Sequence, residues 1–224
     1  ENHQCISSQY SGNKGPVSIS GGNNMRNPLY RAFIDAGVEA GYSETKDYNG
    51  FKQEGFGQKF MNVDRGIRAS SSHAYLKQAK KRPNLTISSR ALVQRIQISG
   101  KTATGVECEI NGHTKVFNAQ REVILCAGAI GSPQLLQVSG VGPKNTLAAA
   151  GIEQIHELPG VGENLQDHLE FNFQYSCKKP ISLNSELGLL KKAIIGVQWL
   201  LFKTGLGRTN HFESCAFIRS RAGV

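Results

Sequence analysis

The densest run of polar side chains in this sequence is residues 160–170, GVGENLQDHLE. Its polar groups are Glu163, Asn164, Gln166, Asp167, His168 and Glu170. A histidine beside carboxylates can move protons, and a carboxylate held at a fixed position can attract a cation. By type alone, however, His168 is more often a structural hydrogen-bonding residue than a base, and a glutamate such as Glu170 at the start of a strand is usually solvated. The elements around the segment therefore have to decide its role.

The backbone of the segment is expected to turn sharply. Gly160 and Gly162 permit a tight turn, and short polar side chains can tie irregular chain by local hydrogen bonds. Beyond Glu170, aromatic residues alternate with polar ones, which places Phe171 and Phe173 on one face of a strand. We predict that this face packs in a core.

Two helices are predicted in the first third of the chain. Asn27 followed by Pro28 is typical of a helix start, a capping side chain before proline at the first helical position, and the apolar pattern continues to about Gly41. Serines at 70–72 predict the cap of a second helix, which Pro83 ends.

Short strand patterns follow at residues 85–88, 92–98, 104–110 and 113–119. Asn111-Gly112 joins the last two and predicts a type I′ hairpin, because both central positions of that turn need positive φ. Residues 122–136 then read as a buried strand, a glycine turn, and a helix capped by Ser132 with Pro133 at its first position. Such a strand-to-helix turn is one arm of an α/β fold, and nucleotide cofactors bind at turns of this kind. No G-x-G-x-x-G loop occurs in the sequence.

Composition and charge exclude several classes of protein. The 224 residues are 39% hydrophobic and 19% charged, which is typical of a soluble globular protein. The net charge of +9 is spread along the chain apart from one cluster, Lys77, Lys80, Lys81 and Arg82. That cluster lies at the end of a predicted helix, where cations are favourable, and no nucleic-acid-binding motif accompanies it. We therefore predict no nucleic-acid partner.

The five cysteines are too widely spaced for a C-x-x-C site, so we predict structural thiols in a reducing compartment and no metal.

No targeting leader can be identified, and no apolar run is long enough to span a bilayer. Leu187, Leu190, Ile194, Val197 and Leu201 form the apolar stripe of an amphipathic helix. This helix packs on a core or, with its lysines and Trp199, lies at a membrane surface.

From residue 128 the sequence resembles a known family. GAIGSPQLLQVSGVG (128–142), ELPGVGENLQDHLE (157–170) and NHFESCAFIRSR (210–221) resemble the glucose-methanol-choline family of FAD-dependent oxidoreductases, and within it the choline-oxidising members. The resemblance covers nearly the whole chain. In this family the dinucleotide loop lies near the N-terminus and the catalytic histidine near the C-terminus. The chain shows neither, so we expect a central fragment with no catalytic residue of its own.

The resemblance implies a fold and a domain plan. The fold is α/β (α+β overall), with part of a Rossmann-like FAD-binding domain and part of an antiparallel-sheet substrate domain. Residues 65–168 correspond to the central segment of the FAD-binding domain. Residues 1–64 and 169–224 correspond to segments of the substrate domain.

It also implies site residues. Val93, Ala127 and Gly128 match family positions that lie against FAD, and Glu170 matches the glutamate that faces the trimethylammonium group of choline in choline-oxidising relatives. His211 is a weaker candidate for the substrate pocket.

The implied function is FAD-dependent oxidation of choline to betaine aldehyde, a step of glycine betaine biosynthesis. Two alternatives remain open: oxidation of another primary alcohol, and a non-catalytic remnant module. The resemblance further implies peripheral association with a bacterial or mitochondrial inner membrane, on its reducing side. The electron acceptor is not indicated. We expect the fragment alone to bind no FAD and to turn nothing over.

Overall fold

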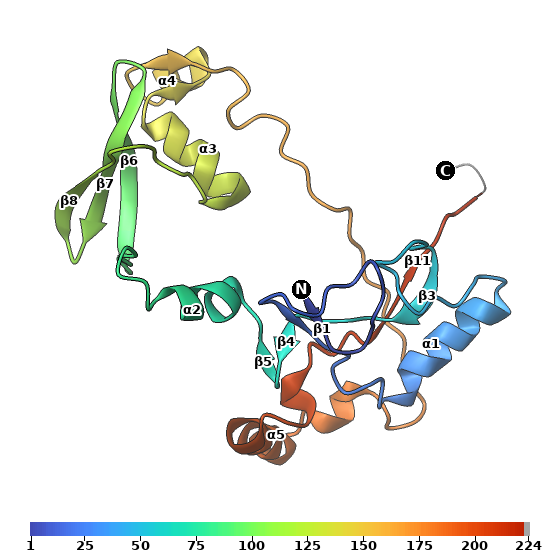
Figure 1. Cartoon of the computed structure of the whole chain (residues 1–224). Helices are drawn as coiled ribbons and strands as arrows, with labels where there is room; N and C mark the ends of the chain where they lie inside the picture. Colours follow the sequence, from blue (N-terminus) through green and yellow to red (C-terminus); the bar gives the residue numbers. More distant parts are fainter. Residues whose placement is uncertain (222–224) are drawn as a thin grey trace. The chain divides into compact units, whose positions relative to one another are not determined.

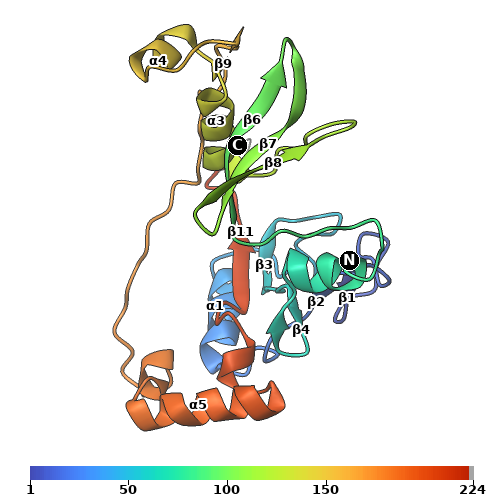
Figure 2. The same ribbon diagram turned by 90° about the vertical axis from the view of Figure 1, so that its left-hand side faces the viewer.

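The computed structural model describes residues 1–221, which form two compact units. Unit 1 comprises residues 1–85 together with the stretch from Gln174 onward, and unit 2 is Thr86–Phe173. Unit 1 is thus discontinuous in sequence and unit 2 is inserted into it. The two units are described separately below, and Figures 1 and 2 show their elements.

Unit 1 is built around helix α1, Pro28–Glu39. The side chain of Asn27 accepts a hydrogen bond from the backbone N–H of Leu29 at 2.9 Å, so the predicted cap is confirmed. On the inner face Ile34 is 1% exposed. The helix packs against strand β3, Gly55–Gln58, and strand β11, Ser214–Phe217, which pair antiparallel. Chain segments from both ends of the sequence therefore share one small core.

Short elements complete unit 1. The second predicted helix is present: Ser70 Oγ accepts from the backbone N–H of His73 at 3.2 Å, and the helical stretch is π-helical before it becomes α-helical. The short elements are β1 (Asn2–His3), β2 (Ser18–Ile19), β4 (Val63–Asp64), β5 (Ile67–Arg68), η1 (Ser72–Leu76), α2 (Lys77–Ala79), η2 (Leu183–Glu186) and η3 (Leu206–Arg208).

Helix α5, Leu189–Phe202, confirms the predicted amphipathic helix but not its packing on a core. Its apolar stripe is exposed: Leu190 is 76% and Ile194 57% accessible. The helix is held instead by its other side, where the indole Nε1 of Trp199 donates to the backbone oxygen of Gly66 at 2.7 Å. Among residues 1–221, no helix is both long enough and apolar enough to cross a membrane.

Unit 2 contains a three-stranded antiparallel sheet in the order β6-β7-β8, formed by Ala91–Ser99, Thr102–Ile110 and His113–Asn118. Asn111 and Gly112 adopt φ of 53° and 78°, which confirms the predicted type I′ turn. Helix α3, Gly128–Val138, packs against β6. Directly after α3, the buried hydroxyl of Ser139 accepts from the backbone N–H of Ile96 at 2.8 Å and donates to the carbonyl of Leu135 at 2.6 Å.

Three local predictions for unit 2 and the residue that precedes it are wrong. Residues 85–88 and 122–127 form no strand. A buried strand needs hydrogen-bonded neighbours on both sides, and no described strand pairs with either stretch, so Ile124 is 74% exposed. The third error is the helix start: α3 begins at Gly128, with Pro133 inside it and Ser132 accepting from the N–H of Ala127 at 3.2 Å.

The rest of unit 2 consists of short elements followed by an extended stretch. Strands β9 (Val141–Gly142) and β10 (His156–Glu157) pair in parallel around helix α4 (Lys144–Ala149), whose Leu147 is 1% exposed. Gly162 has φ of 87°, as expected for the tight turn. From there to residue 177 the chain has no regular structure, and Phe171 and Phe173 are exposed rather than packed in a core.

Candidate functional site

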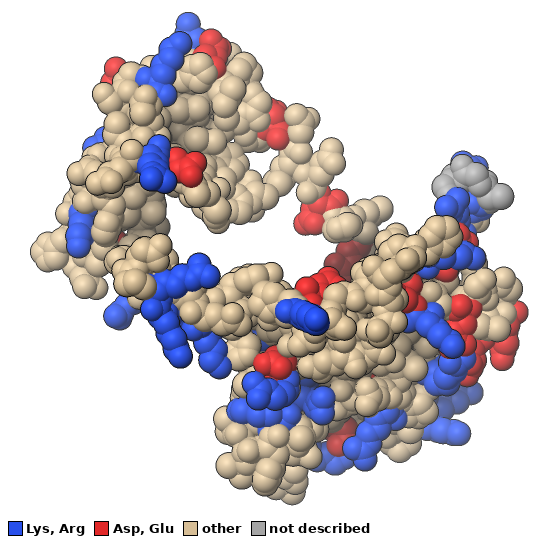
Figure 3. All heavy atoms as spheres, viewed as in Figure 1, with Lys and Arg blue, Asp and Glu red and all other residues tan. Residues whose placement is uncertain are grey.

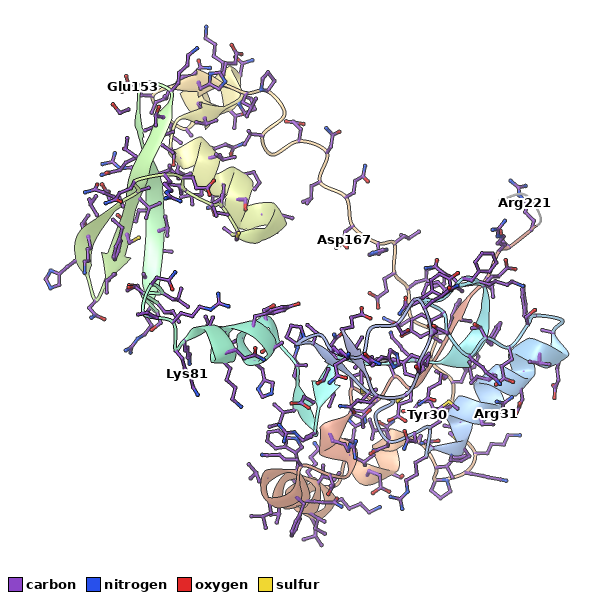
Figure 4. The ribbon with its side chains drawn as sticks, in the orientation of Figure 1. Tyr30, Arg31, Lys81, Glu153, Asp167 and Arg221 are labelled. Atoms are coloured by element: carbon purple, nitrogen blue, oxygen red, sulfur yellow. The ribbon has the colours of Figure 1, made fainter. Side chains whose placement is uncertain are left out.

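Unit 1 contains a pocket of about 620 Å³. Three stretches of chain line it: the approach to α1 with its first turn, the segment from Pro180 to Gln198, and the segment from Gly205 to Glu213. The capping residue Asn27 links two of these stretches, because its Nδ2 donates to the backbone oxygen of Ile181 at 2.8 Å. Tyr30, at the start of α1, is labelled in Figure 4.

The most buried charged residue of this pocket is Glu213, which is 1% exposed. Its carboxylate accepts three hydrogen bonds: from the backbone N–H of Asn23 at 2.9 Å, from the backbone N–H of Met25 at 2.7 Å and from the hydroxyl of Thr209 at 2.9 Å. Between Asn23 and α1 the chain adopts left-handed backbone angles, with φ of 55° at Asn24 and 54° at Met25. Glu213 therefore fixes a conformation that the backbone alone disfavours.

His211, predicted as a pocket residue, lines the pocket. It has φ of 63°, its N–H donates to the hydroxyl of Thr209 at 3.1 Å, and its carbonyl accepts from the hydroxyl of Tyr30 at 2.8 Å. Burial raises the pKa of Tyr30, and the negative charge of Glu213 raises it further. The phenol therefore remains a neutral hydrogen-bond donor.

Three more charged groups lie in the pocket wall, those of Arg26, Glu186 and Lys191. Lys191 is already engaged, because its ammonium donates to the carboxylate of Glu186 at 3.0 Å and to the backbone oxygen of Ser185 at 2.9 Å. Arg26 is exposed to solvent. The buried charge of the wall is therefore negative.

In unit 2 the structure brings together two of the residues predicted to bind cofactor. Val93, on β6, and Ala127, before α3, line one hollow of about 600 Å³ whose other walls are mainly aliphatic. Gly128 has φ of 84°, and a β-carbon at this position would meet nothing within 4 Å. A flat, apolar ring can thus approach the backbone at the turn between Ala127 and Gly128.

Glu170 belongs to no helix or strand. It is exposed and lies in the stretch without regular structure, three residues before the last residue of unit 2, Phe173. It lines neither the unit 1 pocket nor the unit 2 hollow. Asp167, labelled in Figure 4, lies in the same extended stretch, and its only side-chain hydrogen bond among the described residues is to the N–H of His168 at 2.8 Å.

The basic cluster and the cysteines show no further site. Lys77, Lys80, Lys81 and Arg82 project into solvent around α2, where Figure 3 shows basic side chains. The five cysteines are free, and only Cys108 is fully buried. Among residues 1–221, no group of three or more His, Cys, Asp or Glu side chains could hold a metal ion.

Sequence reasoning missed Glu213 and Tyr30. A usable signal existed for Glu213: it is the one charged residue in HFESCAFI, just before the alternating pattern of β11. Tyr30 gave none, since an aromatic residue on the first turn of a helix is most often part of its apolar face.

The chain matches the family model described as GMC oxidoreductase over residues 3–170. It is 60% identical over 216 residues to the oxygen-dependent choline dehydrogenase of Photobacterium profundum, covering 96% of this chain and 38% of that protein. It is 58% identical over 217 residues to the protein of the same name from Vibrio vulnificus, with 96% and 39% covered. The chain therefore spans about two fifths of the length of these curated relatives.

Solved structures of FAD-containing oxidoreductases also superpose on this chain. A formate oxidase from Aspergillus oryzae RIB40 superposes with a TM-score of 0.83 at 25% identity over 97% of this chain and 39% of that one. An FAD-dependent oxidoreductase from Chaetomium thermophilum gives 0.76 at 27% identity over 93% and 37%. These matches confirm the predicted resemblance and the mixed α/β fold class with its Rossmann-like part.

Proposed function

The chain belongs to the GMC oxidoreductase family, and from this premise we propose that it is the central part of a flavoenzyme that oxidises choline to betaine aldehyde. Relatives named oxygen-dependent choline dehydrogenase at 58% and 60% identity support choline as the substrate. The observation that carries the chemistry is the placement of Val93 and Ala127 on one apolar hollow.

FAD is the cofactor we propose, and the residues present fit part of it. The aliphatic hollow around Val93 and the open backbone at Gly128 suit a flat aromatic ring. No G-x-G-x-x-G loop is present to hold a pyrophosphate. When bound, FAD supplies the acceptor for the hydride that leaves the α-carbon of the alcohol.

The chain's own contribution is to bind and orient the alcohol. We assign His211 to the pocket wall and Glu170 to the attraction of the trimethylammonium group, which cannot donate a strong hydrogen bond and is recognised by charge and by ring faces. The base that removes the hydroxyl proton is assigned to no residue of this chain. Peripheral attachment to the reducing side of an inner membrane is part of the same proposal; the exposed apolar stripe of α5 beside Lys191 and Lys192 supports it.

The test uses the polypeptide encoded by the complete reading frame that contains residues 1–224, purified with FAD. Choline should bleach the flavin absorbance under anaerobic conditions. Replacing Glu170 by Gln should lower kcat/KM for choline by about tenfold or more. The matched control is Glu157→Gln, which removes an exposed carboxylate of β10 that lines none of the described pockets and should leave kcat/KM unchanged.

Each alternative corresponds to a different result. Flavin bleaching by other primary alcohols but not by choline would support oxidation of an alcohol by FAD and would contradict choline as the substrate. A protein that binds no FAD would favour the non-catalytic module.

A further inference from the structure

The wall of the unit 1 pocket holds a buried carboxylate without a counter-ion. Glu213 is 1% exposed, and it forms no ion pair with any Lys, Arg or His of residues 1–221. Buried charges in proteins are ordinarily paired, because removing an ion from water is costly. An unpaired one in a pocket wall is a place where a bound cation is favourable.

The hydrogen bonds of Glu213 suit a carboxylate. The N–H groups of Asn23 and Met25 and the hydroxyl of Thr209 all donate to it. Two of these donors are backbone groups that cannot reverse their role. The charge is therefore fixed in position, and no flexible side chain has to be ordered when a cation binds.

The negative potential of Glu213 reaches the pocket. Together with burial, its charge raises the pKa of Tyr30, a residue that also lines the pocket. The neighbouring ammonium of Lys191 does not cancel this potential, because it is paired with Glu186 at 3.0 Å. Arg26 is exposed, where its charge is screened by solvent.

Aromatic and aliphatic side chains form part of the remaining wall, beside polar side chains such as Ser182 and Gln198. The rings of Tyr30 and His211 and the aliphatic side chains of Ile181, Ile194 and Leu206 line the same pocket. A metal ion would need several oxygen ligands, and a primary ammonium would need several hydrogen-bond acceptors arranged around it. A quaternary ammonium carries charge on an apolar surface and needs neither.

We propose that Glu213 is the specificity-determining residue of this pocket, selecting the quaternary ammonium end of a cationic alcohol over uncharged alcohols of the same shape. The inference rests on the proposed function. Its charge acts through space across the pocket wall, and contact between its oxygens and the ligand is not required.

The experiment compares two substrates of one shape in the protein from the complete reading frame. One is choline; the other is its neutral isostere, in which a tert-butyl group replaces the trimethylammonium group. Glu213→Gln should lower the ratio of the two kcat/KM values, choline over isostere, by about tenfold or more, because only choline loses an electrostatic interaction. Glu213→Asp, which keeps the charge, should retain most of the ratio.

A second variant adds a charge without touching Glu213. Ile194 lines the pocket on α5 and is 57% exposed, so Ile194→Lys should fold and should lower the same ratio by about threefold or more. The control is Glu39→Gln, which removes an exposed carboxylate at the end of α1 outside the pocket and should leave the ratio unchanged. If Glu213→Gln yields no folded protein, the Ile194→Lys result decides alone.

The two proposals fail in distinguishable ways. A wild-type enzyme that oxidises choline, with a ratio unchanged in both Glu213→Gln and Ile194→Lys, overturns this inference and leaves the proposed function standing. A wild-type enzyme whose flavin is not reduced by choline overturns the proposed function, and this inference with it.

Discussion

Glu213 and Glu170 both belong to motifs by which the family is recognised, yet they lie in opposite surroundings. Glu213 is 1% exposed and accepts three hydrogen bonds from residues of unit 1. Glu170 lies in an exposed stretch without regular structure, next to Leu169, which is 93% exposed. One region supports itself with contacts inside the described chain, and the other has almost none.

The comparison separates a recognisable motif from a self-supporting one. A segment keeps its conformation through buried apolar contacts and satisfied backbone groups. Residues 205–213 have such hydrogen bonds: the carbonyl of His211 accepts from Tyr30 of α1, and the buried carboxylate of Glu213 accepts from the loop before α1. Residues 163–177 have few of either, so their sequence is distinctive for reasons that the contacts of residues 1–221 do not supply.

The largest expected difference is in stability. Glu213→Ala leaves the partly buried N–H groups of Asn23 and Met25 without acceptors and should cost unit 1 about 3 kcal/mol. Glu170→Ala in the same chain removes no such contact and should leave stability unchanged. Hydrogen exchange of the Asn23 and Met25 amides, with the urea midpoint of unit 1, measures both variants. Equal protection of these amides in the two variants would remove the distinction between the regions.

The features that the sequence predicted correctly are those that depend on neighbouring residues. The cap of α1 at Asn27, the Asn111-Gly112 hairpin and the turn at Gly162 were predicted correctly, because each depends on residues within a few positions. The family and the mixed fold class were also predicted correctly, on the residues of extended motifs.

Apart from the start of α3, which is a local error of a few residues, the incorrect predictions depended on distant partners. Residues 122–127 have the composition of a strand but no described strand to pair with. Of the two alternatives for the stripe of α5, packing on a core is wrong, because the stripe is exposed, and a position at a membrane surface stays a prediction. Glu213 was missed because its partners Asn23 and Met25 lie 190 and 188 positions away. The roles of Val93, Ala127, Gly128, His211 and Glu170 toward ligands stay predictions.

A second difference concerns apolar burial. Leu147 is 1% exposed on α4 and Leu169 is 93% exposed in the irregular stretch. Leu147→Ala should cost unit 2 about 3 kcal/mol through lost contacts and a residual cavity, whereas Leu169→Ala should cost nothing measurable. Urea unfolding followed by the amide signals of unit 2 tests the pair. A large effect of Leu169→Ala would mean that the irregular stretch is packed in solution.

A smaller effect is expected where the exposed stretch rejoins unit 1. Asn27 caps α1 through Leu29, and its amide donates to the backbone oxygen of Ile181. Asn27→Ala should cost about 1 kcal/mol from the lost cap, and it should also speed proteolysis near Ile181. Asn27→Asp, which retains the cap but not the amide donor, should restore stability while leaving the proteolysis fast. Slow proteolysis in both variants would show that other contacts hold the Ile181 end.

The smallest expected difference is chemical, and it uses one cysteine from each region. Cys215 lies on β11, two residues after Glu213. Burial raises the pKa of its thiol above the ordinary value, and the ammonium of Lys59 partly opposes that rise. Only the thiolate reacts with an alkylating reagent, so a raised pKa means less thiolate at pH 8 and slower modification. Cys177 is exposed at the end of the irregular stretch and should react first. Mass spectrometry of timed iodoacetamide labelling gives both rates, and Lys59→Ala should slow Cys215 further. Because the rise in pKa depends on burial, a Cys215 that reacts as fast as Cys177 would mean that the chain beside Glu213 opens as readily as the chain beside Glu170.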